Sequence, residues 1–322
     1  LRSLTGMNAS IHPTTGIVLF PDHGRSAEDL LMEAEIAVEA ACHANTRVMH
    51  AGSSNSELIT RGKMLQAELE AAFMNAQFEL YYQPKVNLLQ NRLYGAEALI
   101  RWQHPEHGFI SPELMIPIIE KSRLLQDITL WILNTALHQS RLMRECCPDF
   151  RIAVNISPQL LDSPELVELV TRALRIWNVD PRMLILEITE TSIMVNEDVA
   201  QQNLRKLSET GVLLSIDDFG TGYSSYSYLQ QLPVQEMKID KSFITDLLTD
   251  ENNRRLVKSM IHLGRDFGIN VLAEGIETAG VQQMLVDMGC QYGQGYLISR
   301  PLPVNEMLAW IESTDWRSPG NS

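Results

Sequence analysis

The chain has 322 residues, of which 45% are hydrophobic and 20% charged, so it has the composition of a globular protein with one large domain and a small additional piece. Its formal net charge of -14 argues against a general binder of nucleic-acid polymers, because such a protein needs a basic surface. This charge does not exclude a small anionic nucleotide that is held through metal ions.

The sequence contains neither a membrane-length apolar run nor a recognisable signal peptide. We therefore expect no membrane contact within this chain and a cytoplasmic location, which leaves room for upstream sensory or membrane segments in a larger protein. The cysteines are Cys42, Cys146, Cys147 and Cys290, and they lack the spacing of metal ligands. We interpret them as reduced thiols, since a bridge between the adjacent pair would be strained.

The first fifty residues predict one strand and one helix. An apolar run at 17–20 precedes a turn, and Ser26 is placed to cap a helix over 27–43. One strand and one helix cannot bury a core by themselves, so this small N-terminal fragment is expected to be part of a larger unit. Small polar residues follow it, and we expect a linker at 53–60.

Beyond this linker, short apolar strands alternate with amphipathic helices. The expected strands lie near 78–83, 93–100, 151–155, 183–188, 212–217, 236–240, 270–274 and 295–298. The expected helices lie near 123–145, 163–176, 197–209, 243–267 and 278–288. This alternation predicts an α/β fold of the (β/α)8 TIM-barrel type over 61–315, followed by a flexible tail at 316–322.

Polar residues collect at the carboxyl ends of these strands, where such barrels carry their reacting groups. The apolar run 213–216 ends in Asp217 and Asp218, two neighbouring anions that repel each other unless a cation lies beside them. The other expected strand ends carry Glu97, Asn155, Glu187, Lys238, Glu274 and Gln294. Each could be an ordinary solvated or ion-paired residue, but their convergence on one rim indicates a site for Mg2+ or Mn2+, which favour these oxygens.

Ordered motifs at these positions resemble the EAL domains, a family of cyclic di-GMP phosphodiesterases. The tripeptide Glu97-Ala98-Leu99 matches the motif that names the family, and the likeness runs from about residue 60 to 312. Further matching stretches are Asn-Ile-Ser-Pro at 155–158, Glu-Ile-Thr-Glu at 187–190, Asp-Asp-Phe-Gly-Thr-Gly-Tyr-Ser-Ser at 217–225, Lys-Ile-Asp-Lys-Ser-Phe at 238–243 and Ala-Glu-Gly-Ile-Glu-Thr at 273–278.

The N-terminal fragment resembles a different domain. The stretch that begins Gly-Ile-Val-Leu-Phe-Pro-Asp-His-Gly at residue 16 is similar to the C-terminal end of a GGDEF domain. We interpret residues 1–52 as such a remnant. The signature loop of that domain is absent from this sequence, so the resemblance implies no cyclase activity.

The EAL resemblance implies a role for each matching residue at the reacting centre. The implied ligands of a first metal are Glu97, Asn155, Glu187 and Asp217, while Asp217 would bridge to a second ion that Asp218 also holds. The resemblance makes Lys238 the residue that orients the nucleophilic water. It makes Glu274 a base or a partner of the second metal, and the choice between Lys238 and Glu274 as the base stays open.

Other matching residues are implied to bind the substrate or to support the site. Arg101 would pair with a substrate phosphate, while Gln83, Asp240 and Gln294 would meet the nucleotide. Glu190 is expected to steady the loop 219–225 through Thr221 or Ser224. Glu277 is expected to support the site from outside the ligand set.

The resemblance implies hydrolysis of cyclic di-GMP to linear pGpG by a water that two Mg2+ or Mn2+ ions activate, with Ca2+ inhibitory and a homodimer as the assembly. One alternative is an inactive EAL domain that serves as a cyclic di-GMP receptor. Inactive relatives lose metal ligands, the loop glutamate or the lysine, whereas this sequence keeps all of them. The sequence also leaves open an unrelated barrel hydrolase of another phosphoester and a dimerising regulatory partner.

Overall fold

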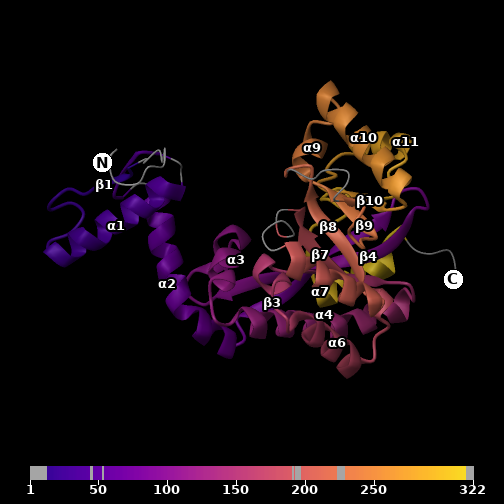
Figure 1. Cartoon of the computed structure of the whole chain (residues 1–322), viewed down its shortest axis with the longest axis horizontal. Coiled ribbons are helices and arrows are strands. Elements are labelled where there is room, and N and C mark those ends of the chain that lie inside the picture. The colour runs from indigo at the N-terminus through magenta and orange to yellow at the C-terminus, as the bar shows by residue number, and fades with distance from the viewer. Residues whose placement is uncertain are drawn as a thin grey trace. The chain divides into compact units, whose positions relative to one another are not determined.

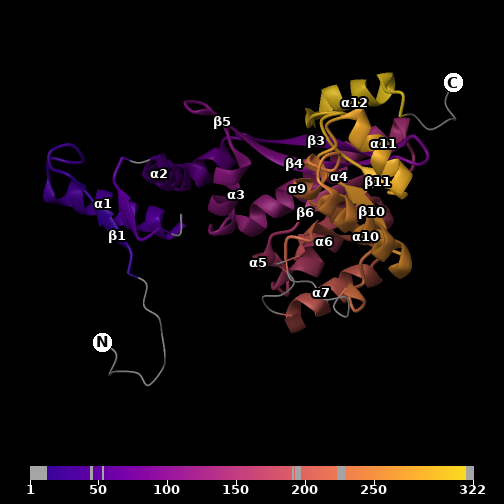
Figure 2. The ribbon, with the colours of Figure 1, turned by 90° about the horizontal axis from the view of Figure 1, so that it is seen from above.

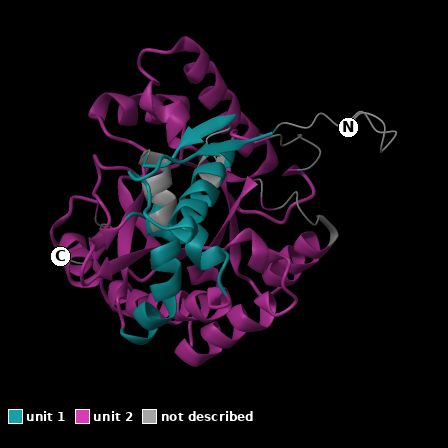
Figure 3. Ribbon diagram, turned by 90° about the vertical axis from the view of Figure 1, so that its left-hand side faces the viewer, with its two compact units in different colours: residues 1–75, 111–122 teal, residues 76–110, 123–322 magenta. Residues whose placement is uncertain are grey.

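The computed structural model describes residues 13–43, 46–52, 54–190, 192, 197–222 and 229–316. The chain divides into two compact units (Figure 3). The smaller unit comprises residues 1–75 and 111–122, and the larger comprises residues 76–110 and 123–322. Ser224 lies outside the described residues, as do the parts of the expected linker and tail at 53 and 317–322.

The smaller unit packs helices around a two-stranded parallel sheet. Its elements are β1 (Thr15–Ile17), α1 (Ala27–His43), β2 (Val48–His50), α2 (Ser54–Met74) and α3 (Pro112–Glu120), and α1 contacts both strands and α2. The hydroxyl of Ser26 accepts a hydrogen bond from the backbone N–H of Asp29 at 3.0 Å, which caps α1 where the sequence predicts its start.

Two details of this unit differ from the expectation. The strand lies at 15–17 instead of 17–20, because a turn closes where His23 N–H donates to the carbonyl of Leu19 at 2.8 Å. The segment expected to be a linker is helical from Ser54 onward, since α2 begins there.

The larger unit is a closed barrel of strands surrounded by helices (Figures 1 and 2). Among the described residues its strands run in the order β3 (Phe78–Asn87), β11 (Tyr292–Gly293), β10 (Asn270–Ala273), β9 (Glu236–Ile239), β8 (Leu213–Phe219), β7 (Leu184–Thr189), β6 (Arg151–Asn155) and β4 (Arg92–His104). Pairing of β3 with β4 closes the ring, and β5 (Gly108–Ile110) and β12 (Leu302–Pro303) add to β4 and β3. The predicted barrel is confirmed.

The first strand departs from a regular (β/α)8 barrel. β3 runs antiparallel to both neighbours, β4 and β11, whereas β4 and β6 to β11 pair with one another in parallel. Residues 88–91 join β3 to β4, and a connection this short can only reverse the chain. The carbonyl oxygen of the Asn87 side chain accepts from the N–H groups of Leu89 and Gln90, which holds the turn.

The last barrel strand lies at Tyr292–Gly293, so its predicted position at 295–298 was wrong. Residues 295–299 instead form a turn, in which the N–H groups of Ile298 and Ser299 both donate to the carbonyl of Gly295. A Cβ on Gly295 would lie 2.2 Å from the carbonyl oxygen of Ile276. The close approach of these two backbones therefore requires glycine and ends the strand.

Among the described residues, the outer layer of the larger unit consists of α4 (Leu125–Cys146), α5 (Pro158–Leu161), α6 (Leu166–Trp177), η1 (Pro181–Met183), α7 (Glu197–Glu209), α9 (Lys241–Thr245), α10 (Glu251–Phe267), α11 (Ala279–Met288) and α12 (Val304–Ser313). Asp250 caps the start of α10 by accepting from the N–H of Asn252, and Gly268 ends that helix in a left-handed conformation with φ 69°. In the described part of the chain, every helix is too short or too polar to cross a membrane.

Candidate active site

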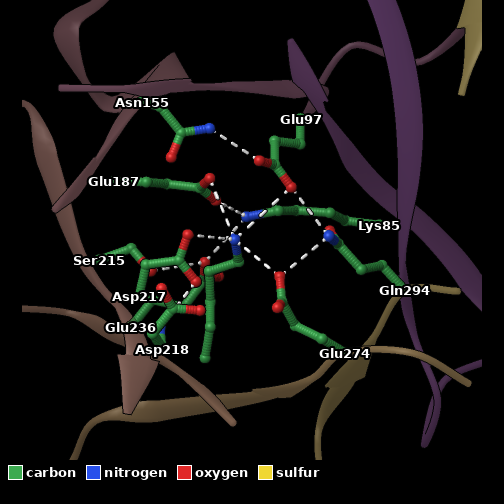
Figure 4. Close-up of polar contacts among 11 residues, drawn as sticks. Lys85, Glu97, Asn155, Glu187, Ser215, Asp217, Asp218, Glu236, Glu274 and Gln294 are labelled. Atoms are coloured by element: carbon green, nitrogen blue, oxygen red, sulfur yellow. Dashed lines mark hydrogen bonds and ion pairs between the residues drawn. The ribbon is translucent and has the colours of Figure 1, made fainter. Parts of the chain in front are cut away.

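Lys238, near the end of β9, lies at the centre of a group of carboxylates (Figure 4). Its Nζ is 2.8 Å from Glu274 Oε1, 2.9 Å from Asp217 Oδ2, 3.2 Å from Glu187 Oε2 and 3.5 Å from Glu97 Oε2. The lysine side chain is 1% exposed, so these contacts are shielded from water. The structure thus brings together four of the acids that the sequence placed on separate strand ends.

Two amide side chains hold the carboxylate of Glu97, which extends from β4. Asn155 at the end of β6 donates from Nδ2 to Glu97 Oε1 at 2.8 Å. Gln294, just after β11, donates from Nε2 to Glu97 Oε2 at 2.8 Å and to Glu274 Oε1 at 3.1 Å. Hydrogen bonds to a carboxylate are strong, so these amides fix the orientation of both acids.

A local irregularity of β8 presents Asp217 and Asp218 together. The pairing of β8 with β9 shifts register between Ile216 and Phe219, and Asp218 adopts a positive φ of 53°. Its N–H donates to Asp217 Oδ1 at 2.9 Å, and the hydroxyl of Thr221 donates to the Asp218 carbonyl at 2.8 Å. Such bulges re-aim side chains at the rims of barrels, and here both carboxylates reach the site.

The acids form two groups with the geometry of metal sites. One group is Glu97, Glu187 and Asp217, and the other is Asp217, Asp218 and Glu274. Within each group the three ligand oxygens lie within 4.8 Å of one another. Carboxylate oxygens at this spacing are the donors that hard divalent cations favour. The arrangement therefore fits metal binding, and Asp217 belongs to both groups.

The buried carboxylates of the site outnumber the two lysines, Lys85 and Lys238, that contact them. The pKa values of the carboxyl groups reflect this excess of negative charge. Burial, with a contribution from Glu97, raises the pKa of Glu187 to about 8, and burial raises that of Glu274 to about 7. Burial also disfavours ionisation of Glu97, but Lys238 and Lys85 outweigh it and lower the pKa to about 2. One acid thus ionises at the expense of its neighbours, and a divalent cation would allow all of them to ionise.

The carboxylate of Glu190, directly after β7, holds the turn that follows β8. Its Oε2 accepts from the backbone N–H of Gly220 at 2.9 Å and of Gly222 at 3.4 Å. A Cβ on Gly222 would lie 2.6 Å from Glu190 Oε1, so glycine is needed for this approach. Glu190 therefore holds the expected loop through the backbone groups of Gly220 and Gly222, and the hydroxyl of Thr221 donates to the Asp218 carbonyl. The predicted alternative partner, Ser224, lies outside the described residues.

The residues expected to bind substrate are more dispersed. Gln83 and Gln294 line a pocket of about 270 Å³ beside Glu274, and Glu277, which was expected to support the site, lines it as well. Its other lining residues are Lys241, Gly275, Gly295 and Tyr296. Arg101 lies further along β4, where its guanidinium stands 5.7 Å from the ring centre of Tyr81.

Asp240 contributes to the site less directly. Its carboxylate caps α9 by accepting from the N–H of Ser242 at 3.0 Å, and it contributes to the raised pKa of Asp218 behind burial and Asp217. Its contacts among the described residues are therefore those of a helix cap.

Three buried polar residues beneath the site were missed at the sequence level. Lys85 on β3 contacts Glu187 and Glu236, and the hydroxyl of Ser215 donates to Glu236 Oε1 at 3.1 Å. Lys85 and Ser215 are each 0% exposed, and Glu236 is 2% exposed. For two of the three the signal is spacing, because Ser215 and Glu236 each precede a site residue by two positions on the same face of a strand.

Comparison with known proteins then settles the family. A sequence description of the family called EAL domain matches residues 66–301, which is most of the chain. The chain belongs to the EAL domain family. Its acids at Glu97, Glu187 and Asp217 thus stand in an EAL domain at positions suited to a metal ion.

Relatives of this EAL chain include a protein of stated activity. The bifunctional diguanylate cyclase/cyclic di-GMP phosphodiesterase MucR of Pseudomonas aeruginosa is 38% identical over 304 residues, which cover 94% of this chain and 44% of MucR. The chain spans less than half the length of several curated relatives that it matches.

Solved structures show the same fold. The structure titled PaMucR phosphodiesterase, c-di-GMP complex, matches with a TM-score of 0.73 and 41% identity, covering 76% of this chain and 99% of that one. The EAL enzyme Bd1971, in a form bound to cAMP and cyclic-di-GMP, matches with a TM-score of 0.75 and 34% identity, covering 89% of this chain and 76% of that one.

Proposed function

We propose that this chain hydrolyses cyclic di-GMP to linear pGpG. In this reaction the oxygen of a water molecule bonds to one phosphorus, the bond from that phosphorus to a ribose 3′ oxygen breaks, and the 3′ oxygen takes up a proton. The observation that carries the proposal is the pair of acid groups that share Asp217. The phosphodiesterase relatives and the nucleotide complex named above support the choice of substrate.

The donor set of the site fits two divalent cations. We assign Glu97, Asn155, Glu187 and Asp217 to one ion, and Asp217, Asp218 and Glu274 to the other. Such cations would lower the pKa of a water molecule and offset the charge of the phosphodiester oxygens. We propose Mg2+ or Mn2+ as the active ions and Ca2+ as an inhibitor, because Ca2+ favours a larger and less rigid ligand shell.

The protein groups around the reacting atoms have distinct tasks in this proposal. The acids around Lys238 hold its pKa well above the ordinary value despite burial, so the lysine stays charged and can donate hydrogen bonds that orient the water and stabilise developing negative charge. Glu274 lies 2.8 Å from Lys238 Nζ and belongs to the group of acids assigned to the second ion. In this proposal it holds that ion beside the lysine, and an ion-bound water needs no separate base.

The substrate would lie over the pocket beside these groups. Gln83, Gln294 and Tyr296 line this pocket and offer hydrogen bonds and an aromatic face to a nucleotide base. Arg101 carries a planar guanidinium that could pair with a phosphate, although in this structure it contacts Tyr81 and the Ile100 carbonyl.

The proposal extends to the organisation of the chain. We propose that residues 1–52 are the remnant of a GGDEF-like domain, that residues 61–315 form the phosphodiesterase unit, and that the active species is a cytoplasmic homodimer. The β1–α1–β2 arrangement of the smaller unit, with its parallel strands, supports the interpretation of this segment as the end of a domain. Mass measurement in solution, with and without nucleotide, tests the dimer.

The test of the function is conversion of cyclic di-GMP by the purified chain with Mg2+, Mn2+ or Ca2+, followed by separation of the nucleotides on an anion-exchange column. We expect linear pGpG with Mg2+ or Mn2+, and no product from a Glu97→Ala variant. Tight retention of cyclic di-GMP without any linear product in all three metals would contradict hydrolysis and identify a receptor.

A further inference from the structure

A second buried lysine lies directly beneath the carboxylate group. Lys85 reaches from β3 into the barrel, and its Nζ is 2.5 Å from Glu187 Oε1 and 3.0 Å from Glu236 Oε1. Figure 4 shows its side chain entering from the side opposite Glu187, so that the two meet in the barrel interior. A buried lysine needs anionic partners, and these two carboxylates provide them.

The strand register places Lys85 in a deeper layer than Lys238, because Lys85 pairs with Gly95, which precedes Glu97 by two residues on β4. Glu236 precedes Lys238 by two residues on β9, and Ser215 precedes Asp217 by two residues on β8. Ser215 pairs with Glu236 across β8 and β9, and it also pairs with Glu187 across β7 and β8. Two residues along a strand correspond to roughly 6.6 Å, so the two lysines occupy successive layers.

Glu187 connects the two layers through its two oxygens. Its Oε1 accepts from Lys85 below, while its Oε2 lies 3.2 Å from Lys238 in the upper layer. A metal ion in the upper layer would compete with Lys238 for oxygens, because that lysine contacts all four surrounding acids. The metal ion would leave the contact between Lys85 and Glu187 Oε1 in place, since that contact is on the other side of the Glu187 carboxylate.

We propose that Lys85 is a positioning residue for the metal centre, in that it holds Glu187 from below so that Oε2 stays directed at the ions. This inference rests on the proposed function, because the centre it serves is the one assigned there. Groups that bond to a metal ligand from its far side commonly change metal affinity or activity by about 10- to 100-fold. Lys85 is not expected to touch substrate or water.

The competing interpretation is that Lys85 only neutralises Glu236. The hydroxyl of Ser215 also donates to Glu236 Oε1, so Glu236 has partners suited to a structural role. The two interpretations predict different results when Glu236 is changed together with Lys85. If Lys85 serves Glu236 alone, removing both charges restores the site; if it holds Glu187, the defect remains.

The experiment compares the unmodified 322-residue chain with Lys85→Met, Glu236→Gln and the double variant. Mn2+ binding is measured by calorimetry without nucleotide, and folding is checked by circular dichroism and thermal unfolding. We expect Lys85→Met and the double variant to bind Mn2+ about 10- to 100-fold more weakly, while Glu236→Gln stays close to the wild type. Raising the Mn2+ concentration should recover turnover of both Lys85 variants.

Several results would overturn the inference. Wild-type Mn2+ affinity in Lys85→Met would do so, and so would recovery of affinity in the double variant. If Lys85→Met fails to fold, the double variant decides, since it buries no unpaired charge on Glu236. A wild type that binds Mn2+ but leaves cyclic di-GMP intact refutes only the proposed hydrolysis, whereas a wild type that binds no Mn2+ refutes both.

Discussion

Replacing Lys238 by methionine tests whether the acids around it form a cation site. The change removes a charge that lies 2.8–3.5 Å from four carboxylates and is 1% exposed. Removing one member of a buried ion pair costs about 3–5 kcal/mol of folding free energy. We expect the Lys238→Met variant to lose folding free energy of this size in the absence of metal. Proton uptake by Glu187 and Glu274 limits the loss, because burial has raised their pKa values to about 8 and about 7.

A divalent cation should replace the missing positive charge. A ligand that binds only the folded state at a concentration 100 times its dissociation constant adds about 2.7 kcal/mol of stability. In Lys238→Met the oxygens are no longer shared with the lysine, so we expect Mn2+ to stabilise this variant more than it stabilises the wild type. Turnover should nevertheless fall at least about 100-fold, because the donor to the developing charge is gone.

The assay is urea unfolding of both proteins in EDTA and in Mn2+, with Lys258→Met as the control. Lys258 is an exposed lysine on α10, and its replacement should change stability by less than about 0.5 kcal/mol. Metal-free Lys238→Met that is as stable as the wild type would refute the electrostatic reasoning. Equal stabilisation of both proteins by Mn2+ would refute the competition between lysine and metal.

Three further measurements probe other parts of the site. Glu190→Ala should lower turnover by about 10- to 100-fold with little change in secondary structure by circular dichroism, because it frees the turn after β8; unchanged turnover would contradict this role. Mn2+ affinity measured by calorimetry should rise from pH 6 to 8, since the raised pKa values of Glu187 and Glu274 leave protons that metal must displace below pH 8, and a flat profile would exclude this. Burial raises the pKa of Cys290 to about 12, so peptide mapping after alkylation at pH 8 should find exposed Cys42 modified and Cys290 modified only in denaturant.

The sequence predicts the rim of the barrel well, because apolar strands that end in acids leave a direct trace in the residue pattern. Asp217 and Asp218 stood out because two adjacent anions follow a buried run, and the structure brings them beside Glu274. The register shift of β8 that presents both side chains depends on its pairing with β9, which no local pattern records.

Two differences between the predicted and the observed barrel have distinct physical causes. One follows from a local rule of chain connection, and the other from a contact between distant segments. The antiparallel course of β3 follows from the short connection at 88–91, and the connection rule alone would have predicted it. The displaced last strand follows from the approach of Gly295 to Ile276, a contact between distant segments. Tertiary contacts of that kind override strand propensity, so the apolar run at 295–298 forms a turn instead of a strand.

The environment of Glu187 explains why strand ends alone reveal the ligands but not what holds them. Each carboxylate among the candidate ligands offers two oxygens, and only one of them needs to face an ion. In Glu97 both oxygens are held by amides of the same rim, which strand-end residues can supply. In Glu187 one oxygen points down the barrel, so its partner, Lys85, must come from the interior of a strand. Burial of a lysine in the middle of a strand costs folding free energy unless the lysine contacts acids there. A buried lysine in the layer below the rim of a related barrel therefore indicates that one of its metal-binding acids has a second partner.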